Sequence, residues 1–141
     1  NNMVKVNLRN GTLDLGIVTN NIDKMLTFYS ETLGFEKVGE VPFPGLGVVN
    51  KLDCGKCQIK ILALEKPPNN ENIKGDFTAS SGFRYCTMNL TNLKEVVNSC
   101  ITSNQKVVNE PMEIRSNVWV AIIQDPDGNL IELMQDGTID E

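Results

Sequence analysis

One carboxylate, Glu132, stands in the most distinctive stretch of the chain, with apolar residues on both sides. The stretch Asp125–Leu133 contains a tight turn, because its proline presets φ and its glycine can adopt a positive φ. The residues flanking this turn are mainly β-branched and apolar, which favours two strands. Glu132 therefore lies mid-strand, and because an isolated buried carboxylate is very costly, it must face water or a polar cavity.

Cysteine is the other residue type that could do chemistry, since the chain has no histidine. Cys54 and Cys57 have the CxxC spacing, which is typical of half a zinc site or of a redox pair. Zinc would need about two further ligands, and Cys86 and Cys100 are isolated in a strand pattern and a helix pattern. The redox motif usually opens a helix, whereas the Gly-Lys between this pair favours a hairpin turn. We therefore expect reduced, structural cysteines.

The whole-chain composition is that of an ordinary soluble domain. A length of 141 residues suits one domain or a pair of small modules with a common core. The net charge of −5 argues against nucleic acid, because no basic stripe is present to neutralise phosphates. No run approaches the ~18 apolar residues of a membrane span, and the first ten residues lack the apolar core of a signal peptide. We expect a cytoplasmic protein.

The apolar pattern predicts the same order of elements twice: a strand, a helix and three strands. Helical spacing predicts helices over 22–33 and 93–103, each preceded by an asparagine that can cap it. Segment 67–82 is polar and without periodicity, which indicates a linker. The predicted strands are 13–18, 36–41, 46–52 and 58–64 in the first half, and 83–90, 106–108, 118–123 and 130–134 in the second.

The two halves can be aligned with each other as an internal repeat. Aligning the predicted helices places Asp14 against Tyr85 on the first strands. On the last strands Lys60 falls against Glu132, after a one-residue change that hairpins of different length would produce. Each half therefore offers two comparable positions where a polar side chain could reach a ligand.

With this repeat and its closing turn, the chain resembles the vicinal oxygen chelate superfamily, which includes glyoxalase I, bleomycin and fosfomycin resistance proteins and extradiol dioxygenases. The resemblance covers roughly residues 12 to 135 and depends on Leu13–Val18, Phe28-Tyr29, Leu33-Gly34-Phe35 and Asp125–Leu133. It implies an α+β fold of two βαβββ modules, about 12–66 and 83–135, which form cupped mixed sheets. It also implies a homodimer, with a small-molecule ligand inside the cup.

In metal-dependent members of this family the ligands are typically His or Gln on the first strands and Glu on the last. Carried over, these places hold Asp14, Lys60, Tyr85 and Glu132, of which only Glu132 is of the usual type. An ammonium has no lone pair, and a protonated phenol is a poor ligand. Asp14 and Glu132 could still hold a hard cation loosely through waters, but the expectation is a site without metal or cofactor.

Alternation along the strands places Thr87 beside Tyr85 and Met134 beside Glu132. Among Asp14, Lys60 and Glu132 one carboxylate is in excess, which favours either a raised carboxyl pKa or a bound cationic group. The alternative is an inert cluster in which Lys60 pairs with Asp14 or Glu132. Trp119 shares its face with apolar residues and is expected in the core rather than as a stacking platform. The predicted ligand-binding residues are Asp14, Lys60, Tyr85, Thr87, Glu132 and Met134.

The leading functional hypothesis is a metal-independent binding protein for a cationic or aromatic small molecule, similar to the antibiotic-sequestering bleomycin resistance branch. The alternative is a metal-free enzyme of lyase, isomerase or transferase type that uses Lys60, Tyr85 or Glu132 in acid–base chemistry. A third possibility is a vestigial cup on a protein that acts through its surface. The sequence identifies neither the ligand nor a catalytic residue.

Overall fold

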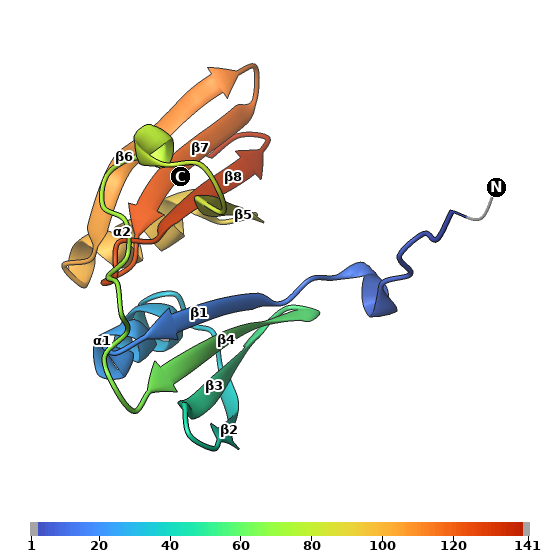
Figure 1. Cartoon of the computed structure of the whole chain (residues 1–141). Coiled ribbons are helices and arrows are strands. Elements are labelled where there is room, and N and C mark those ends of the chain that lie inside the picture. The colour runs from blue at the N-terminus through green and yellow to red at the C-terminus, as the bar shows by residue number, and fades with distance from the viewer. Residues whose placement is uncertain (1–2, 140–141) are drawn as a thin grey trace. The chain divides into compact units, whose positions relative to one another are not determined.

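The structure, a computed structural model, describes residues 3–139, which form two four-stranded mixed sheets (Figure 1). In each sheet the first strand runs parallel to the last, and the other neighbours are antiparallel. The first sheet has the order β1-β4-β3-β2 and the second the order β5-β8-β7-β6. The predicted α+β fold of two βαβββ repeats is confirmed. The strands are β1 (Leu15–Thr19), β2 (Lys37–Phe43), β3 (Gly47–Cys54), β4 (Cys57–Leu64), β5 (Tyr85–Asn89), β6 (Lys106–Arg115), β7 (Val118–Gln124) and β8 (Leu130–Asp136).

The chain divides into two compact units, each described here by itself. Within the described residues, the first unit contains 3–22 and 35–68, and the second contains 23–34 and 69–139. The second unit therefore takes in most of α1 (Ile22–Leu26) and its π-helical continuation η2 (Thr27–Thr32), in addition to α2 (Leu93–Thr102). Short 3-10 turns, η1 (Arg9–Gly11) and η3 (Phe77–Ala79), occur one in each unit.

Both predicted helices form, and both contribute to the core of the second unit. Phe28 and Tyr29 are fully buried and pack edge to face, with ring centroids 4.8 Å apart. The Ser99 hydroxyl on α2 donates to the Thr32 carbonyl over 2.7 Å, which joins the two helical segments. Burial raises the pKa of the Cys100 thiol to about 11, so this cysteine stays a neutral core residue. No helix among residues 3–139 is long and apolar enough to cross a membrane.

Two strands are longer than predicted because proline did not end them. β2 continues through Pro42 to Phe43, and β6 continues through Pro111 to Arg115. Both are edge strands, where proline is tolerated because one side of the strand needs no ladder hydrogen bond. In β6 the pairing with β7 also shifts register several times, as bulges do.

Alternation along the strands decides which residues share a face of each sheet. On the buried face of the first sheet Leu52 and Ile61 are fully covered. Asn50 lies beside them, and its amide donates to the Ile61 carbonyl over 3.2 Å. On the second sheet the buried residues include Ala121 and Ile123, and Trp119 shares their face, as alternation predicts. The opposite face of each sheet carries the candidate site residues.

Candidate functional site

A buried hydrogen bond joins the two most distinctive sequence motifs. The Tyr29 hydroxyl donates to Oδ2 of Asp125 over 2.7 Å inside the second unit. The same carboxylate accepts from the Asn129 amide over 2.8 Å and from the backbone N–H groups of Asp127 and Asn129 over 2.9 Å each. Asp125 is 2% exposed, and this burial raises its pKa, although the hydrogen bonds partly offset the effect. Burial and the Asp125 charge raise the pKa of Tyr29 well above its usual range. Asp125 therefore organises the turn that begins β8.

On the first sheet the structure brings two of the predicted site residues, Asp14 and Lys60, together. Lys60 Nζ lies 3.0 Å from Oδ2 of Asp14, and Oδ1 of Asp14 accepts from the Gln58 backbone N–H over 2.9 Å. These two hydrogen bonds lower the pKa of Asp14. Of the two pairings that the inert-cluster alternative allowed for Lys60, the one with Asp14 is present.

The Asp14–Lys60 pair does not fit a divalent metal. The ammonium already occupies one carboxylate oxygen of Asp14, and its charge repels a metal ion. Within residues 3–139, no group of three or more His, Cys, Asp or Glu side chains is arranged to hold a metal ion. No step involving a metal is therefore assigned to these residues.

On the second sheet the predicted residues share one face, on which Tyr85 and Thr87 are exposed and the β7 partners of Glu132 and Met134 are buried. Thr87 is paired in register with Glu132, and its hydroxyl donates to Oε1 of Glu132 over 2.7 Å. Glu132 is half-buried and forms no ion pair with any residue in the described part of the chain. Met134 lies one pleat further along β8 and is also half-buried. The second sheet therefore presents a carboxylate whose charge no neighbouring cation balances.

The linker supplies an aromatic residue to this face that the sequence did not indicate. The Phe77 ring of η3 packs against Tyr85, with centroids 4.7 Å apart and the planes tilted by 57°. The turn is fixed by Arg84, whose guanidinium donates to the carbonyls of Phe77 and Asp76 over 3.3 and 2.8 Å. Asp76 also caps η3, and its bonds to the Thr78 backbone and hydroxyl lower its pKa. Phe77 and Tyr85 therefore form an ordered aromatic pair. Tyr85 is the first residue of β5 and lies two residues before Thr87.

Lys51 is a second residue of interest that the sequence prediction missed. It lies opposite Lys60 in the β3–β4 register, on the same exposed face. The signal was present, because the two-residue turn after Cys54 fixes the pairing of Cys54 with Cys57 and hence of Lys51 with Lys60. With Lys51 included, the excess of negative charge expected from Asp14, Lys60 and Glu132 disappears.

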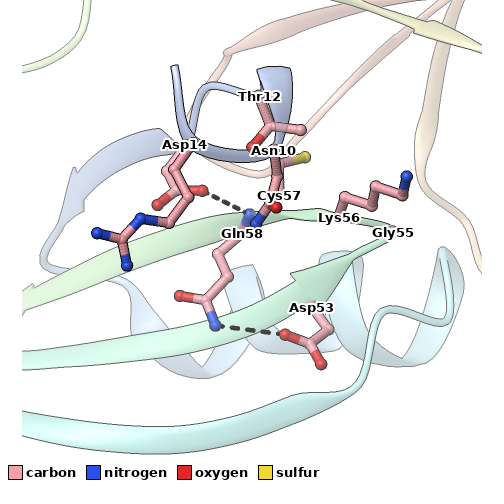
Figure 2. A pocket seen from close by; sticks show the side chains of 9 residues that line it. Asn10, Thr12, Asp14, Asp53, Gly55, Lys56, Cys57 and Gln58 are labelled. Carbon is pink, nitrogen blue, oxygen red and sulfur yellow. Dashed lines mark hydrogen bonds between the residues drawn. The ribbon is translucent and has the colours of Figure 1, made fainter. Parts of the chain in front are cut away.

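The β3–β4 hairpin also borders a hollow of about 390 Å³ in the first unit (Figure 2). Residues 9–14 of the N-terminal segment line one side and residues 53–58 of the hairpin line the other. Its polar lining includes Asp14 and Asp53, both hydrogen-bonded to Gln58. Cys57 lines the hollow too, and its thiol donates to the Cys54 carbonyl over 3.0 Å. The CxxC pair thus lies at a hairpin tip, as predicted, and no disulfide joins any of the four cysteines.

Comparison with known proteins identifies the family. Residues 12–133 match the model of the Glyoxalase/Bleomycin resistance protein/Dioxygenase superfamily, and the chain belongs to this superfamily. Among curated proteins, none matches the sequence significantly.

Solved structures of similar fold agree with this assignment. A glyoxalase family protein from Bacillus cereus has 17% identity and a TM-score of 0.78, with 97% of this chain and 100% of the other covered. A glyoxalase family protein from Enterococcus faecalis has 20% identity and a TM-score of 0.69, with coverage of 86% and 94%. A glyoxalase I mutant from Zea mays has 17% identity and a TM-score of 0.73, with coverage of 89% and 45%. At these identities the likeness extends to the fold alone.

Proposed function

We propose that this chain is a metal-independent binding protein for a small organic cation with an aromatic or apolar body, and that the second sheet provides the binding face. The observation that carries the proposal is Glu132. Glu132 is half-buried, accepts one hydrogen bond from Thr87 and forms no ion pair among the described residues. Such a carboxylate is available to a positively charged group.

The neighbours of Glu132 suit the rest of such a ligand. Tyr85 and Phe77 present aromatic surface at one end of the strand pair, and aromatic faces attract organic cations. Met134 on β8 and Met112 on β6 both pair with Val120, so flexible apolar side chains border the other end. Methionine adapts its shape to irregular ligands. A few polar groups in an apolar surround are typical of small-molecule sites.

The experiment is a titration calorimetry series with benzyltrimethylammonium, against its neutral isostere neopentylbenzene delivered at equal cosolvent. We expect the cation to bind several-fold more tightly than the isostere, because its quaternary nitrogen gains ~0.5–2 kcal/mol from the aromatic faces and up to ~1 kcal/mol from the Glu132 charge. Glu132→Gln should weaken cation binding by a similar factor. Glu110→Gln, an exposed charge change on β6 of the same sheet, is the matched control.

Two results would contradict the proposal. One is equal binding of cation and isostere, which would mean that Glu132 does not select charge. The other is cation binding that depends on an added divalent metal and disappears with chelator. Turnover of a bound ligand that Glu132→Gln abolishes would instead favour the metal-free enzyme.

A further inference from the structure

The two cysteines at the β3–β4 hairpin tip lie directly opposite each other. Cys54 ends β3 and Cys57 begins β4, and the two residues are register partners across a two-residue turn. Register partners have their side chains on the same side of a hairpin. The Cys57 thiol is turned toward its partner, because it donates to the Cys54 carbonyl over 3.0 Å. Both residues are thiols, and both are half-buried.

The spacing of this pair suits a disulfide bond. Residues that flank a two-residue turn form a hydrogen-bonded pair whose Cα atoms are ~5.5 Å apart, inside the ~4.4–6.8 Å range of disulfides. Their Cβ atoms are ~4.5–5.5 Å apart where a disulfide needs ~3.5–4.5 Å, so the tip has to close by only about 1 Å. The turn residues Gly55 and Lys56 are exposed, and a Cβ added at Gly55 would meet no atom within 4 Å. No packed neighbour at Gly55 therefore resists this movement.

A small reagent can reach Cys57 through the hollow of about 390 Å³ beside the hairpin. Figure 2 shows Cys57 among the polar side chains of its lining. The volume is within the ~300–1,000 Å³ range of small-molecule sites. The lining has two cationic side chains, Arg9 and Lys56, and two carboxylates, Asp14 and Asp53. The hollow therefore does not select a reagent by its charge.

The other two cysteines lack this combination of a partner and access. Cys100 is fully buried on α2, and burial raises its pKa to about 11, which keeps the thiol protonated and unreactive. Cys86 is half-buried on β5, and its register partner is Ile131. All four cysteines lie within residues 3–139, and only Cys54 and Cys57 are register partners of each other.

We propose that Cys54 and Cys57 form a reversible oxidation site that exchanges with small organic disulfides. The Cys57 thiolate attacks one sulfur of the reagent, which forms a mixed disulfide and releases a first thiolate. The Cys54 thiolate then attacks the Cys57 sulfur, which forms the Cys54–Cys57 bond and releases a second thiolate. The two cysteine protons go to the released thiolates, so the protein loses two electrons and the reagent becomes two thiols.

This oxidation is reversible because the closed loop is short and half-exposed. A disulfide between Cys54 and Cys57 closes a loop of only four residues, which constrains the unfolded chain little. Accessible disulfides of this kind are readily reduced by thiols. The site lies in the first unit, and it does not rest on the cation site proposed for the second sheet.

The reduced full chain is incubated with 2-hydroxyethyl disulfide, alkylated to stop exchange, unfolded and digested. Trypsin cleaves after Lys51, Lys56 and Lys60, so it separates Cys54 from Cys57. We expect the peptides 52–56 and 57–60 joined by a disulfide as the main product, and dithiothreitol should separate them. The equilibrium constant for exchange should be at least about tenfold larger for the native chain than for the chain unfolded in urea, because the hairpin holds the thiols opposite each other.

Single substitutions separate the roles of the two thiols. In Cys54→Ser the mixed disulfide on Cys57 should accumulate, because no thiol is left to displace the reagent. In Cys57→Ser the remaining thiol should react about tenfold more slowly, since Cys54 does not line the hollow. Cys86→Ala is the matched control and should leave the yield of linked peptides unchanged.

The proposal is overturned if the linked peptides do not form in the native chain, or if Cys57 is joined instead to Cys86 or Cys100. It is also overturned if Cys57→Ser reacts as fast as the unsubstituted chain. Equal equilibrium constants for the native chain and the chain in urea would overturn it as well, because the hairpin would then contribute nothing. This last comparison uses the unsubstituted chain and does not require either serine variant to fold.

Discussion

Lys60 and Glu132 hold equivalent positions in the two sheets. Lys60 lies on β4 between Gly16 and Lys51, and Glu132 lies on β8 between Thr87 and Ile122. The strand order is the same in both sheets, yet one position carries an ammonium and the other a carboxylate. The backbone therefore determines the position of the polar group, and the side chain at that position determines whether the face favours a negatively or a positively charged ligand.

The immediate neighbours make this contrast sharper. Asp14 partners Lys60, but Lys51 brings a second positive charge to the same row. Glu132 has only the Thr87 hydroxyl, and its partner Ile122 is apolar. The first face thus carries lysines with a carboxylate among them, and the second has a carboxylate without an ion pair in the described part of the chain.

The turns that lead into the last strands differ as well. The β3–β4 connection is a two-residue turn between Cys54 and Cys57, which pair directly. The β7–β8 turn is organised by the buried Asp125 carboxylate, which Tyr29 reaches from the helical segment. The β7–β8 turn therefore depends on a buried carboxylate, and the β3–β4 turn does not.

The largest effect should come from inverting the second face with Glu132→Lys. Affinity for benzyltrimethylammonium should fall ~30-fold, because an ion-pair attraction of up to ~1 kcal/mol becomes a repulsion of similar size. Calorimetry with the cation measures the loss. Glu110→Lys is the control. Equal losses in both variants would mean that overall charge, not this site, sets the affinity.

Next in size is the loss of folding stability in Asp125→Asn, which we expect to be about 1–3 kcal/mol. The new amide would place its donors against the Asn129 amide, which now donates to Oδ2 of Asp125. Adding Asn129→Asp restores a donor–acceptor pair and should recover more than half of the loss. The Asn129 side-chain oxygen also accepts from Asn72, and a carboxylate keeps that bond. Urea unfolding of both single variants and the double variant measures the coupling.

Additive effects in that cycle would contradict a direct Asp125–Asn129 interaction. Hydrogen exchange locates the effect within the molecule. Protection should fall in β7 and β8, whereas β3 and β4 should change less, because the hydrogen-bond partners of Asp125 lie in the second unit.

The sequence predicted most of the fold, because its signals were local. Helical spacing, the Gly-Lys hairpin tip and the turn at Asp125 predicted element types and order, and the repeat alignment matched the register in which Gly16 meets Lys60 and Thr87 meets Glu132. The predicted strand ends at Val41 and Val108 were wrong, since edge position, which lets β2 and β6 continue through a proline, is a property of the assembled sheet.

Contacts between distant segments could not be predicted in the same way. Tyr29 looked like one of several core residues on a helix, and Asp125 looked like a turn residue; nothing in either motif indicated a bond between them. Phe77 lies in a linker without periodicity, so its packing on Tyr85 had no local signal. Lys51 could have been found by counting outward from the hairpin tip.

A smaller effect is expected from Phe77→Leu, which removes the ring that packs on Tyr85. The loss of an aromatic pair should reduce the free energy of unfolding by about 0.5–1.5 kcal/mol, and cation affinity should fall a few-fold through the lost cation–π contact. Phe83→Leu is the matched control, because Phe83 is fully exposed in the same segment. If Phe83→Leu weakened cation binding as much as Phe77→Leu, the Phe77–Tyr85 pair would not be part of the site.

The smallest effect concerns two carboxylates whose pKa values shift in opposite directions. The pKa of Asp14 is lowered from 3.8 by Lys60 and Gln58, and that of Asp125 is raised from 3.8 by burial. Asp14 therefore stabilises the folded state at pH values above its unfolded pKa, and this contribution is lost as pH falls through its folded pKa. Asp125 stabilises the folded state at pH values below its unfolded pKa, and this contribution is lost as pH rises through its folded pKa. Carboxyl carbon shifts of the two side chains, followed by NMR, should titrate on opposite sides of 3.8.

Asp14→Asn and Lys60→Met test whether the first of these shifts has the assigned cause. Lys60→Met should return the Asp14 titration toward its ordinary range without a measurable change in stability at neutral pH, because exposed ion pairs contribute little. The Asp125 titration should not respond to either variant. An Asp14 titration that stayed low in Lys60→Met would assign the shift to the Gln58 backbone bond. Lys60 would then be less tightly held by Asp14 than its 3.0 Å contact indicates.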